Sequence, residues 1–486
     1  MLSTRPLTLL IGASLIAGCT TQAAYKTPDQ LLSGNYTSQA NTSLTSPPTT
    51  LKLEAWWEGF NDPVLTELIE KALKENLDLA QAFTRVEQSK AGNDAALAAL
   101  LPSAHISGQA ARSHQSIETP LGQVLNSSPK FNRNGNAYEL NLAASWELDL
   151  FGSLREQRQG AIAEYQASEA AAVATRLTIE AQTANLYITI RGLQTRLEIA
   201  EKQVKTQEAL LEKAKLLLSK GLLAEYQVHQ AEGSLSQARA ALPLLHTRLD
   251  AAMNGLDVIL GVQPGTTRPT LLAATPIPTA PRIDHIGAPA DLLRRRPDLI
   301  VAERKLAAAN ARVGVAVKEY YPQFSIGALI GNATAVSSKN LFTSGAEQSA
   351  GVLGLRWRLF DFGRINAEIN HAKGQAAEAV ANYKQSALRA TEDVENAVSG
   401  AMNSDTEVTT LTAGEASIAS ARQSSYIAFQ KGAASQIDVL HADESVLRAS
   451  DARAQAQAES ALAAVALFKA LGGGWSDTND QRIASR

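Results

Sequence analysis

The fold is decided by residues 186–221, LYITIRGLQTRLEIAEKQVKTQEALLEKAKLLLSKG, which carry a seven-residue repeat of apolar side chains. One seam holds residues seven apart: Ile190, Leu197, Val204, Leu211 and Leu218. A second seam, interrupted by polar Gln207, holds Leu186, Leu193, Ala200 and Ala214. Two such seams are typical of helices that pack as a coiled coil. Because no proline occurs between Leu154 and Lys220, we expect one helix of about 100 Å there, at about 1.5 Å per residue.

The chain then turns at Gly221 and returns as an Ala-, Gln- and Leu-rich segment that ends at Gly261. The whole arrangement recurs further along the chain, because Trp357 follows Trp146 by 211 residues. The same spacing relates Phe362-Gly363 to Phe151-Gly152, Lys431-Gly432 to Lys220-Gly221, Val439 to Val228, and Leu471-Gly472 to Leu260-Gly261. One constant spacing over more than a hundred residues predicts an internal duplication. The two helical hairpins should therefore match limb for limb.

Two stretches without helical periodicity precede each hairpin. Tyr138–Phe151 alternates apolar with polar residues, as a half-buried strand does, and a polar loop separates it from Ala104–Ser116. The second copy repeats this pattern with Gln323–Thr334 and Gly351–Phe360. Each copy therefore predicts two antiparallel strands. Because an open sheet edge in lipid leaves backbone groups unpaired, we expect closure by symmetry, with three chains supplying twelve strands, a number within the range of outer-membrane barrels.

The N-terminus carries a targeting signal. After Arg5 comes a short apolar run, and small residues then lead to Cys19, the only cysteine in the chain. This pattern is similar to a bacterial lipobox, which predicts a lipidated Cys19; the alternative is an ordinary signal peptide with an incidental cysteine. Thr20 follows, and the absence of Asp at that position favours the outer membrane over the inner membrane. No other run of about 20 apolar residues exists, so we expect no transmembrane helix.

These features divide the chain of 486 residues into six predicted segments. They are a signal peptide (1–18), a lipidated tether (19–50), a first repeat (51–261), a linker (262–290), a second repeat (291–474) and a C-terminal tail (475–486). The net charge of −3 provides no basic field, so nucleic acid is not an expected partner.

Several motifs occur in a fixed order along the chain. They are Trp57 through Phe60, Asp62-Pro63 with Leu65, Trp146 through Gly152, Arg296-Pro297-Asp298 with Ala302-Glu303, Tyr321-Pro322, and Phe360 through Arg364. As an ordered set they resemble the outer-membrane efflux protein family, the TolC-like outer-membrane factors, in its lipoprotein branch of the NodT/OprM kind. The resemblance covers nearly everything after Cys19.

The resemblance implies an α+β membrane protein with four strands and two long antiparallel helical hairpins per chain. Three chains would form a twelve-stranded β-barrel in the outer membrane, continued by a twelve-helix tunnel through the periplasm. The family implies the exit duct of a tripartite pump, in which an inner-membrane transporter of the RND type supplies energy. A periplasmic adaptor protein would dock on the helical tips.

The resemblance also assigns roles to the two hairpin tips. It implies adaptor contact at the first tip, formed by Lys220, Gly221 and Leu222, and at the second, formed by Lys431, Gly432 and Ala433. The simpler interpretation is a pair of helical turns in which glycine supplies a positive φ angle. The two interpretations are compatible.

The periplasmic gate is implied just beyond the tips. Asp438 occupies an acidic position of the family, which threefold symmetry would turn into a ring of three carboxylates that favours cations. His441 stands where a second aspartate is typical, and Gln227 where the other hairpin often has Asp. Phe429 replaces a frequent gating tyrosine. We therefore expect a ring with fewer charges, sensitive to pH through His441. The alternative is that Asp438 only caps the returning helix.

Catalysis is not expected. The sequence has no Gly-x-Ser-x-Gly motif, no phosphate-binding loop and no His/Cys/Asp/Glu cluster with metal-ligand spacing, so we expect neither a metal nor a cofactor. The leading hypothesis is a passive exit duct for small toxic compounds, whose own substrate selection is slight. Two alternatives stay open: the duct of a type I protein secretion system, and a non-conducting periplasmic coiled-coil lipoprotein.

Overall fold

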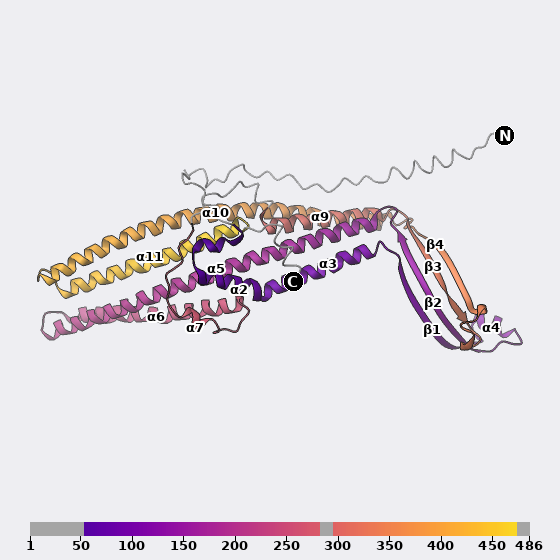
Figure 1. The fold of residues 1–486 in the computed structure, drawn as a ribbon, viewed down its shortest axis with the longest axis horizontal. Coiled ribbons are helices and arrows are strands. Elements are labelled where there is room, and N and C mark those ends of the chain that lie inside the picture. The colour runs from indigo at the N-terminus through magenta and orange to yellow at the C-terminus, as the bar shows by residue number, and fades with distance from the viewer. Residues whose placement is uncertain (1–52, 282–294, 474–486) are drawn as a thin grey trace, which may run out of the picture. The chain divides into compact units, whose positions relative to one another are not determined.

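The computed structural model describes residues 53–281 and 295–473, so Cys19 and the tether at 20–50 lie outside the described residues, as does the tail at 475–486. The chain divides into two compact units, which are treated separately. The strand unit contains Glu87–Ala167 and Glu303–Asn382, and the remaining described residues form the hairpin unit. Figure 1 labels the elements of both.

The strand unit contains one antiparallel sheet in the order β1-β2-β3-β4. The strands are β1 (Ser103–His114), β2 (Asn134–Leu148), β3 (Gln323–Thr334) and β4 (Glu347–Arg356). The four predicted strands are thus confirmed, although the bounds expected for the last one, Gly351–Phe360, were wrong at both ends. Phe360 cannot belong to a strand because its φ angle is 60°, in the left-handed region.

The connections within the strand unit contain short helices. These are α4 (Pro120–Asn126) between β1 and β2, and the 3₁₀ turns η3 (Ser338–Asn340) and η4 (Ser344–Ala346) between β3 and β4. Thr119 caps α4 by accepting a hydrogen bond from the Gly122 amide at 3.1 Å. The sequence patterns predicted only polar loops at these places.

The two faces of the sheet differ in polarity. The register places the side chains of Ile106, Leu140, Leu142, Trp146, Ile326, Ile330, Leu353 and Leu355 on one face, and these side chains are exposed. On the other face Gln348 donates a hydrogen bond to the amide oxygen of Asn141 at 2.7 Å, across Gly331. A Cβ atom at Gly331 would lie 2.4 Å from that oxygen, so glycine is required there. The apolar face has no cover within the described chain.

The hairpin unit begins with η2 (Leu53–Phe60) and α2 (Pro63–Glu75). Asp62 is the N-cap of α2, and its carboxylate accepts hydrogen bonds from the amides of Val64 at 2.9 Å and Leu65 at 3.1 Å. After α2 come α3 (Leu77–Ala98) and, in the second copy, α9 (Pro297–Lys318). Both α3 and α9 contribute residues to both units.

Two helical hairpins follow the strand pairs (Figure 1). The first consists of α5 (Ser153–Ser219) and α6 (Glu225–Ile259), and the second of α10 (Phe362–Gln430) and α11 (Gln436–Ala470). The helix α5 has 67 residues and lies within one residue of the predicted bounds at each end. Both returning helices have 35 residues and begin 211 positions apart, at Glu225 and Gln436. The predicted limb-for-limb match of the hairpins is therefore confirmed.

Ion pairs give the order of the four long helices in the hairpin unit. Lys215–Glu232 at 3.0 Å and Glu208–Arg239 at 2.7 Å join α5 to α6. Arg422–Asp443 and Glu415–Arg453 join α10 to α11. Between the hairpins, Arg196 of α5 binds Asp451 of α11 at 2.8 Å. The order is therefore α6–α5–α11–α10, which makes α6 and α10 the two edge helices.

The main core of the hairpin unit forms where η2 and α2 meet α5, α6 and α11. Trp56 is buried and stacks on Phe468 of α11, with the ring centroids 5.3 Å apart. Tyr187 of α5 donates a hydrogen bond to Asp62 at 2.7 Å, which ties the start of α2 to the hairpin. A smaller core, which includes Val394 and Val398 of α10, lies in the second repeat.

The linker after the first repeat starts with the short helix α7 (Arg268–Leu271) and is held by two buried side chains. Arg191 donates to the Ala273 carbonyl at 2.7 Å, and Gln194 donates to the Leu271 carbonyl at 2.5 Å. Asp257 accepts hydrogen bonds from the amides of Gly265 at 2.6 Å and Thr267 at 3.0 Å. The linker is thus fixed chiefly through its backbone as it leaves the first hairpin.

Candidate functional site

The first hairpin tip reverses at Gly221, whose φ angle is 73°. The Leu222 amide donates to the Leu217 carbonyl at 2.9 Å, and the Gly221 amide to the Leu218 carbonyl at 2.8 Å. This pair of hydrogen bonds is the Schellman motif, which satisfies the last carbonyls of α5 and requires a left-handed residue. Leu222 is 69 % exposed.

The second tip has the same backbone. Gly432 has a φ angle of 75°, its amide donates to Phe429 at 2.9 Å, and the Ala433 amide donates to Ala428 at 2.8 Å. Lys220 and Lys431, each the residue before the glycine, are both exposed. The predicted helical turns are therefore confirmed at both tips, while adaptor contact stays a prediction.

The returning helices start with related but unequal caps. At the second tip Ser435 and Asp438 cap reciprocally: the carboxylate accepts the Ser435 amide at 2.7 Å, and the Ser435 hydroxyl accepts the Asp438 amide at 3.2 Å. At the first tip Gln227 accepts the Ala224 amide at 3.2 Å, and Ala224 has no side-chain acceptor to return the bond. The second tip therefore has a capping box and the first has half of one.

Within a single chain, the hydrogen bonds of the Asp438 side chain all belong to this cap. Hydrogen bonds from the Ser435 hydroxyl and amide hold the pKa of the exposed Asp438 carboxyl below its ordinary value. The carboxylate is ionised at neutral pH and available to a symmetric ring. The capping role that the sequence left as an alternative is thus present, and the pore role stays a prediction.

The other predicted gate residues lie near Asp438 but do not bond to it. His441 is one helical turn further along α11, with Nδ1 3.4 Å from the Glu444 carboxylate. Phe429 is near the end of α10 and 38 % exposed, and half-buried Gln227 belongs to the other tip. The structure therefore joins Asp438 to Ser435 and His441 to Glu444, as two separate pairs.

The ion pairs between the limbs of each hairpin were not predicted from the sequence patterns. In the first hairpin the two residue numbers of each ion pair add to 447, both for Lys215–Glu232 and for Glu208–Arg239. Such a constant sum is the register of an antiparallel hairpin. Opposite charges at equal distances from the centre of the tip, between Leu223 and Ala224, were therefore a signal that could have found these pairs.

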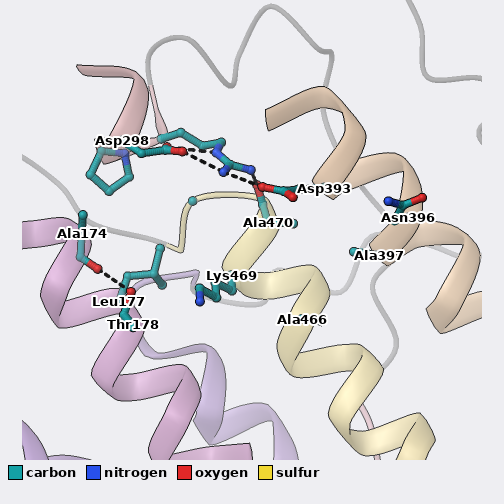
Figure 2. A pocket seen from close by; sticks show the side chains of 13 residues that line it. Ala174, Leu177, Thr178, Asp298, Asp393, Asn396, Ala397, Ala466, Lys469 and Ala470 are labelled. Atoms are coloured by element: carbon teal, nitrogen blue, oxygen red, sulfur yellow. Dashed lines mark hydrogen bonds and ion pairs between the residues drawn. The ribbon is translucent and has the colours of Figure 1, made fainter. Parts of the chain in front are cut away.

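Arg296, in the basic run 294–296, has a structural role. It is largely buried and binds Asp298 at 2.8 Å and Asp393 of α10 at 2.9 Å, beside a cavity of about 530 Å³ (Figure 2). Both carboxylates raise the pKa of its guanidinium against the effect of burial, which lowers it. Nη1 also donates to the Ala470 carbonyl at 3.1 Å.

Asn76 makes the equivalent joint in the first repeat. Its side-chain amide donates to the Ile259 carbonyl at 2.8 Å, and Ile259 precedes Ala470 by 211 residues. Each repeat thus fastens the end of its returning helix to the start of α3 or α9 by one side chain. Different residue types hide this equivalence in the sequence.

Two tryptophans join the strands to the helices within the strand unit. Trp146 Nε1 donates to the Leu100 carbonyl and Trp357 Nε1 to the Tyr320 carbonyl, both at 3.0 Å. Both rings are partly exposed, as side chains at a membrane–water interface are.

Within 53–281 and 295–473, no group of three or more His, Cys, Asp or Glu side chains could hold a metal ion. None of the helices in the described part of the chain is long and apolar enough to cross a membrane.

A sheet with one uncovered apolar face and long paired hairpins together define an outer-membrane channel with a helical extension. The comparisons agree: the chain belongs to the outer membrane efflux protein family, whose pattern matches residues 68–262 and 288–473. It is 30 % identical over 440 residues to the pyoverdine export outer membrane protein OpmQ of Pseudomonas putida, covering 90 % of this chain and 92 % of that protein. Nodulation protein T of Rhizobium leguminosarum bv. trifolii is 27 % identical, over 95 % of this chain and 96 % of that protein.

Solved structures give the same answer for the fold. The outer-membrane channel OprN superposes with a TM-score of 0.81 at 30 % identity, covering 94 % of this chain and all of that one. The CmeC channel of Campylobacter jejuni gives 0.83 at 21 % identity, over 95 % and 97 % of the two chains. The predicted fold class, that of trimeric TolC-like channels, is confirmed. The chain is an outer-membrane efflux component, and the matched proteins are channels rather than enzymes.

Proposed function

We propose that three copies of this chain form the exit duct of a tripartite efflux pump that expels small toxic compounds. The observation that carries the proposal is the duplicated hairpin pair with two identical backbone reversals, attached to strands that expose an apolar face. A duct needs a wall in lipid, a wall in the periplasm and an end that opens. The sheet, the long helices and the tips supply these three parts.

Closure by three copies is supported by the free edges of the sheet and of the row of four long helices. The sheet ends at β1 and β4, and three sheets of four strands give twelve, within the range of outer-membrane barrels. The helical order α6–α5–α11–α10 likewise leaves α6 and α10 uncovered. A structure with two unlike edges closes into a ring by repeating the same contact.

The tips are the proposed docking site of a periplasmic adaptor protein. Leu222 and Tyr226 expose 69 % and 68 % of their surface at the first tip, so both present apolar side chains that a docked partner would cover. Lys220, Lys431 and Ala433 are also exposed. In this proposal the adaptor links the duct to an inner-membrane transporter of the RND type, which supplies the energy.

The proposed gate is the narrow ring formed by the second tip. Three copies of Asp438 would repel one another and attract cations, and Gln227 adds no charge at the other tip. Phe429 would pack at the constriction, and His441 would line it one helical turn from Asp438. Adaptor binding would shift the tips from closed to open by binding the open state more tightly.

The proposed substrates are small organic molecules. Two relatives that are 29 % identical are named a solvent efflux pump protein and a toluene efflux pump protein, both from Pseudomonas putida. Lipidation at Cys19 would fix the chain to the inner leaflet of the outer membrane, with the hairpins in the periplasm.

Single-channel recording in planar bilayers tests the duct. The purified protein should conduct weakly and prefer cations, and Asp438→Ala should raise the conductance and reduce the preference for cations. Glu378→Ala, on an exposed part of α10 away from the tips, is the matched control and should change neither. A protein that never conducts, even with Asp438→Ala and Gly432→Ala combined, would contradict the proposal. Solvent sensitivity of cells that lack the gene then tests the substrate class.

A further inference from the structure

The two hairpins meet along a seam between α5 and α11, both in the hairpin unit. Arg196 donates two hydrogen bonds to Asp451, at 2.8 Å and 3.1 Å. One turn away, a Cβ atom at Gly192 would lie 3.0 Å from the Ala458 Cβ. The two helices therefore pack closely, with a two-pronged arginine–carboxylate pair that fixes their register. This contact is called the internal seam.

The duplication places equivalent positions on the two edge helices. Adding 211 to Gly192 and Arg196 gives Asn403 and Glu407 on α10, and subtracting 211 from Asp451 and Ala458 gives Ala240 and Thr247 on α6. All four edge positions are exposed, whereas their four counterparts in the internal seam are buried or half-buried. Because the paired helices have the same length and register, each edge has the backbone shape of one side of the internal seam.

We propose that α10 of one copy packs against α6 of the next copy in the register of the internal seam, with Glu407 bound to Arg239 of that neighbouring copy. The proposal rests on the trimeric duct and specifies the contact that closes it. In this register Glu407 lies opposite Ala240, and Arg239 is the adjacent residue, with a side chain long enough to reach across.

The charges at the edges support this pairing. Glu407 is exposed and makes no ion pair within the described residues. The Arg239 side chain is 60 % exposed and binds Glu208 of its own α5 through Nη2 at 2.7 Å. A guanidinium group has five N–H donors, so a second carboxylate can be bound without displacing the first.

The sign of the charge differs between the two seams. The position of Arg196 on α5 corresponds to Glu407 on α10. The outgoing helix therefore carries the cation in the internal seam, and it carries the anion in the contact between copies. A hairpin placed against the wrong neighbour would bring like charges together, which disfavours that arrangement. The reversal therefore distinguishes the contact between copies from the contact within one copy.

Cysteine cross-linking in isolated outer membranes tests the register. Glu407→Cys combined with Ala240→Cys should give linked dimers and trimers with a short bismaleimide. Glu407→Cys with Gly233→Cys is the matched control, because that position lies two turns along α6, about 10 Å away, and should give little product. Arg196→Cys with Asp451→Cys checks the reagent within one chain, and each single variant checks for reaction at Cys19.

The outcomes separate this proposal from the duct itself. A trimer by native mass that links through position 233, or through neither position, overturns the register and leaves the duct standing. A wild-type protein that forms no trimer overturns both the register and the duct. Linking at 240 alone supports the register.

Subunit exchange between differently tagged trimers tests the ion pair. Glu407→Arg should speed exchange about tenfold, because each trimer loses three exposed pairs and gains three repulsions. Adding Arg239→Glu to the same chain should restore the wild-type rate to within about threefold, and Glu407→Gln should fall between them. Equal rates for Glu407→Arg and Glu407→Gln would refute the pairing with Arg239.

Discussion

The two hairpins have the same backbone but different surfaces. The outgoing limb α5 buries Leu193, Val204 and Leu210, whereas the matching stretch of α10, residues 399–425, is rich in Ser, Thr and Gly and mostly exposed. Hydroxyls on α10 bond back to its own carbonyls, as Thr410 does to Thr406 at 2.8 Å. After duplication the glycine reversals and helix lengths were kept, and the side chains changed according to what covers each helix.

The largest expected difference is between the two cores. Trp56→Ala should lower the free energy of unfolding by about 3–5 kcal/mol, because it removes a buried ring stacked on Phe468. Val398→Ala in the smaller core removes two carbons and should cost about 2 kcal/mol. The midpoint of thermal loss of helical circular dichroism in detergent measures both. Equal shifts would mean that the two cores contribute alike.

The equivalent joints should differ less. Arg296→Met removes the ion pairs to Asp298 and Asp393 and the bond to a buried carbonyl, and should cost about 3 kcal/mol. Asn76→Ala loses the bond to Ile259 and should cost about 2 kcal/mol. Arg312→Met, which breaks an exposed pair with Glu164, is the control and should change stability by less than about 1 kcal/mol. A larger loss at Asn76 than at Arg296 would reverse this comparison.

The two reversals should respond alike. Gly221→Ala and Gly432→Ala each place a side chain at a positive φ angle in open space, so each should cost about 1 kcal/mol. Gly233→Ala, within α6, should instead stabilise the hairpin by about 0.5–1 kcal/mol. Amide hydrogen exchange of the tip peptides measures these local effects. Unequal changes caused by the two substitutions would contradict this equivalence.

The unequal caps provide a smaller test. Ala224→Ser supplies the acceptor that the first tip lacks and should stabilise the start of α6 by about 0.5–1 kcal/mol. Ser435→Ala removes the matching hydroxyl and should weaken α11 by a similar amount. Exchange rates of the first-turn amides report each change. No change in either variant would mean that neighbouring copies, rather than caps, hold the tips.

The smallest expected effect is acid sensitivity of the second tip. The pKa of the Asp438 carboxyl is lowered in the folded chain. Its cap therefore stabilises α11 fully at pH values above the ordinary pKa of about 4. That contribution is lost as the pH falls through the lowered pKa. Gln227 does not titrate, so the first tip should be unaffected. Hydrogen exchange measured at pH values on both sides of this range should show that only the second tip loosens in acid. Asp438→Asn should abolish this difference between the two tips.

Periodicity and glycine spacing predicted the long helices, the strands and the reversals, because each of these is encoded within a few consecutive residues. The internal seam was not predictable, since Arg196 and Asp451 look like ordinary surface charges until their helices are placed together. The Asn76 and Arg296 joints were hidden for another reason: they lie 220 residues apart, not 211, because the connections within the two strand pairs, residues 115–133 and 335–346, differ in length. The roles of Asp438, His441 and the tips depend on other copies and partners, which a single chain does not contain.

The hydrogen bonds that fix the linker affect which of its residues can be substituted. Arg191 and Gln194 bind main-chain oxygens at Leu271 and Ala273, and every residue type has such an oxygen. The exposed side chains of residues 272–276 can therefore vary without loosening the attachment, and this stretch should change quickly between species. It is also a suitable place to insert a peptide tag for imaging the assembled protein in living cells.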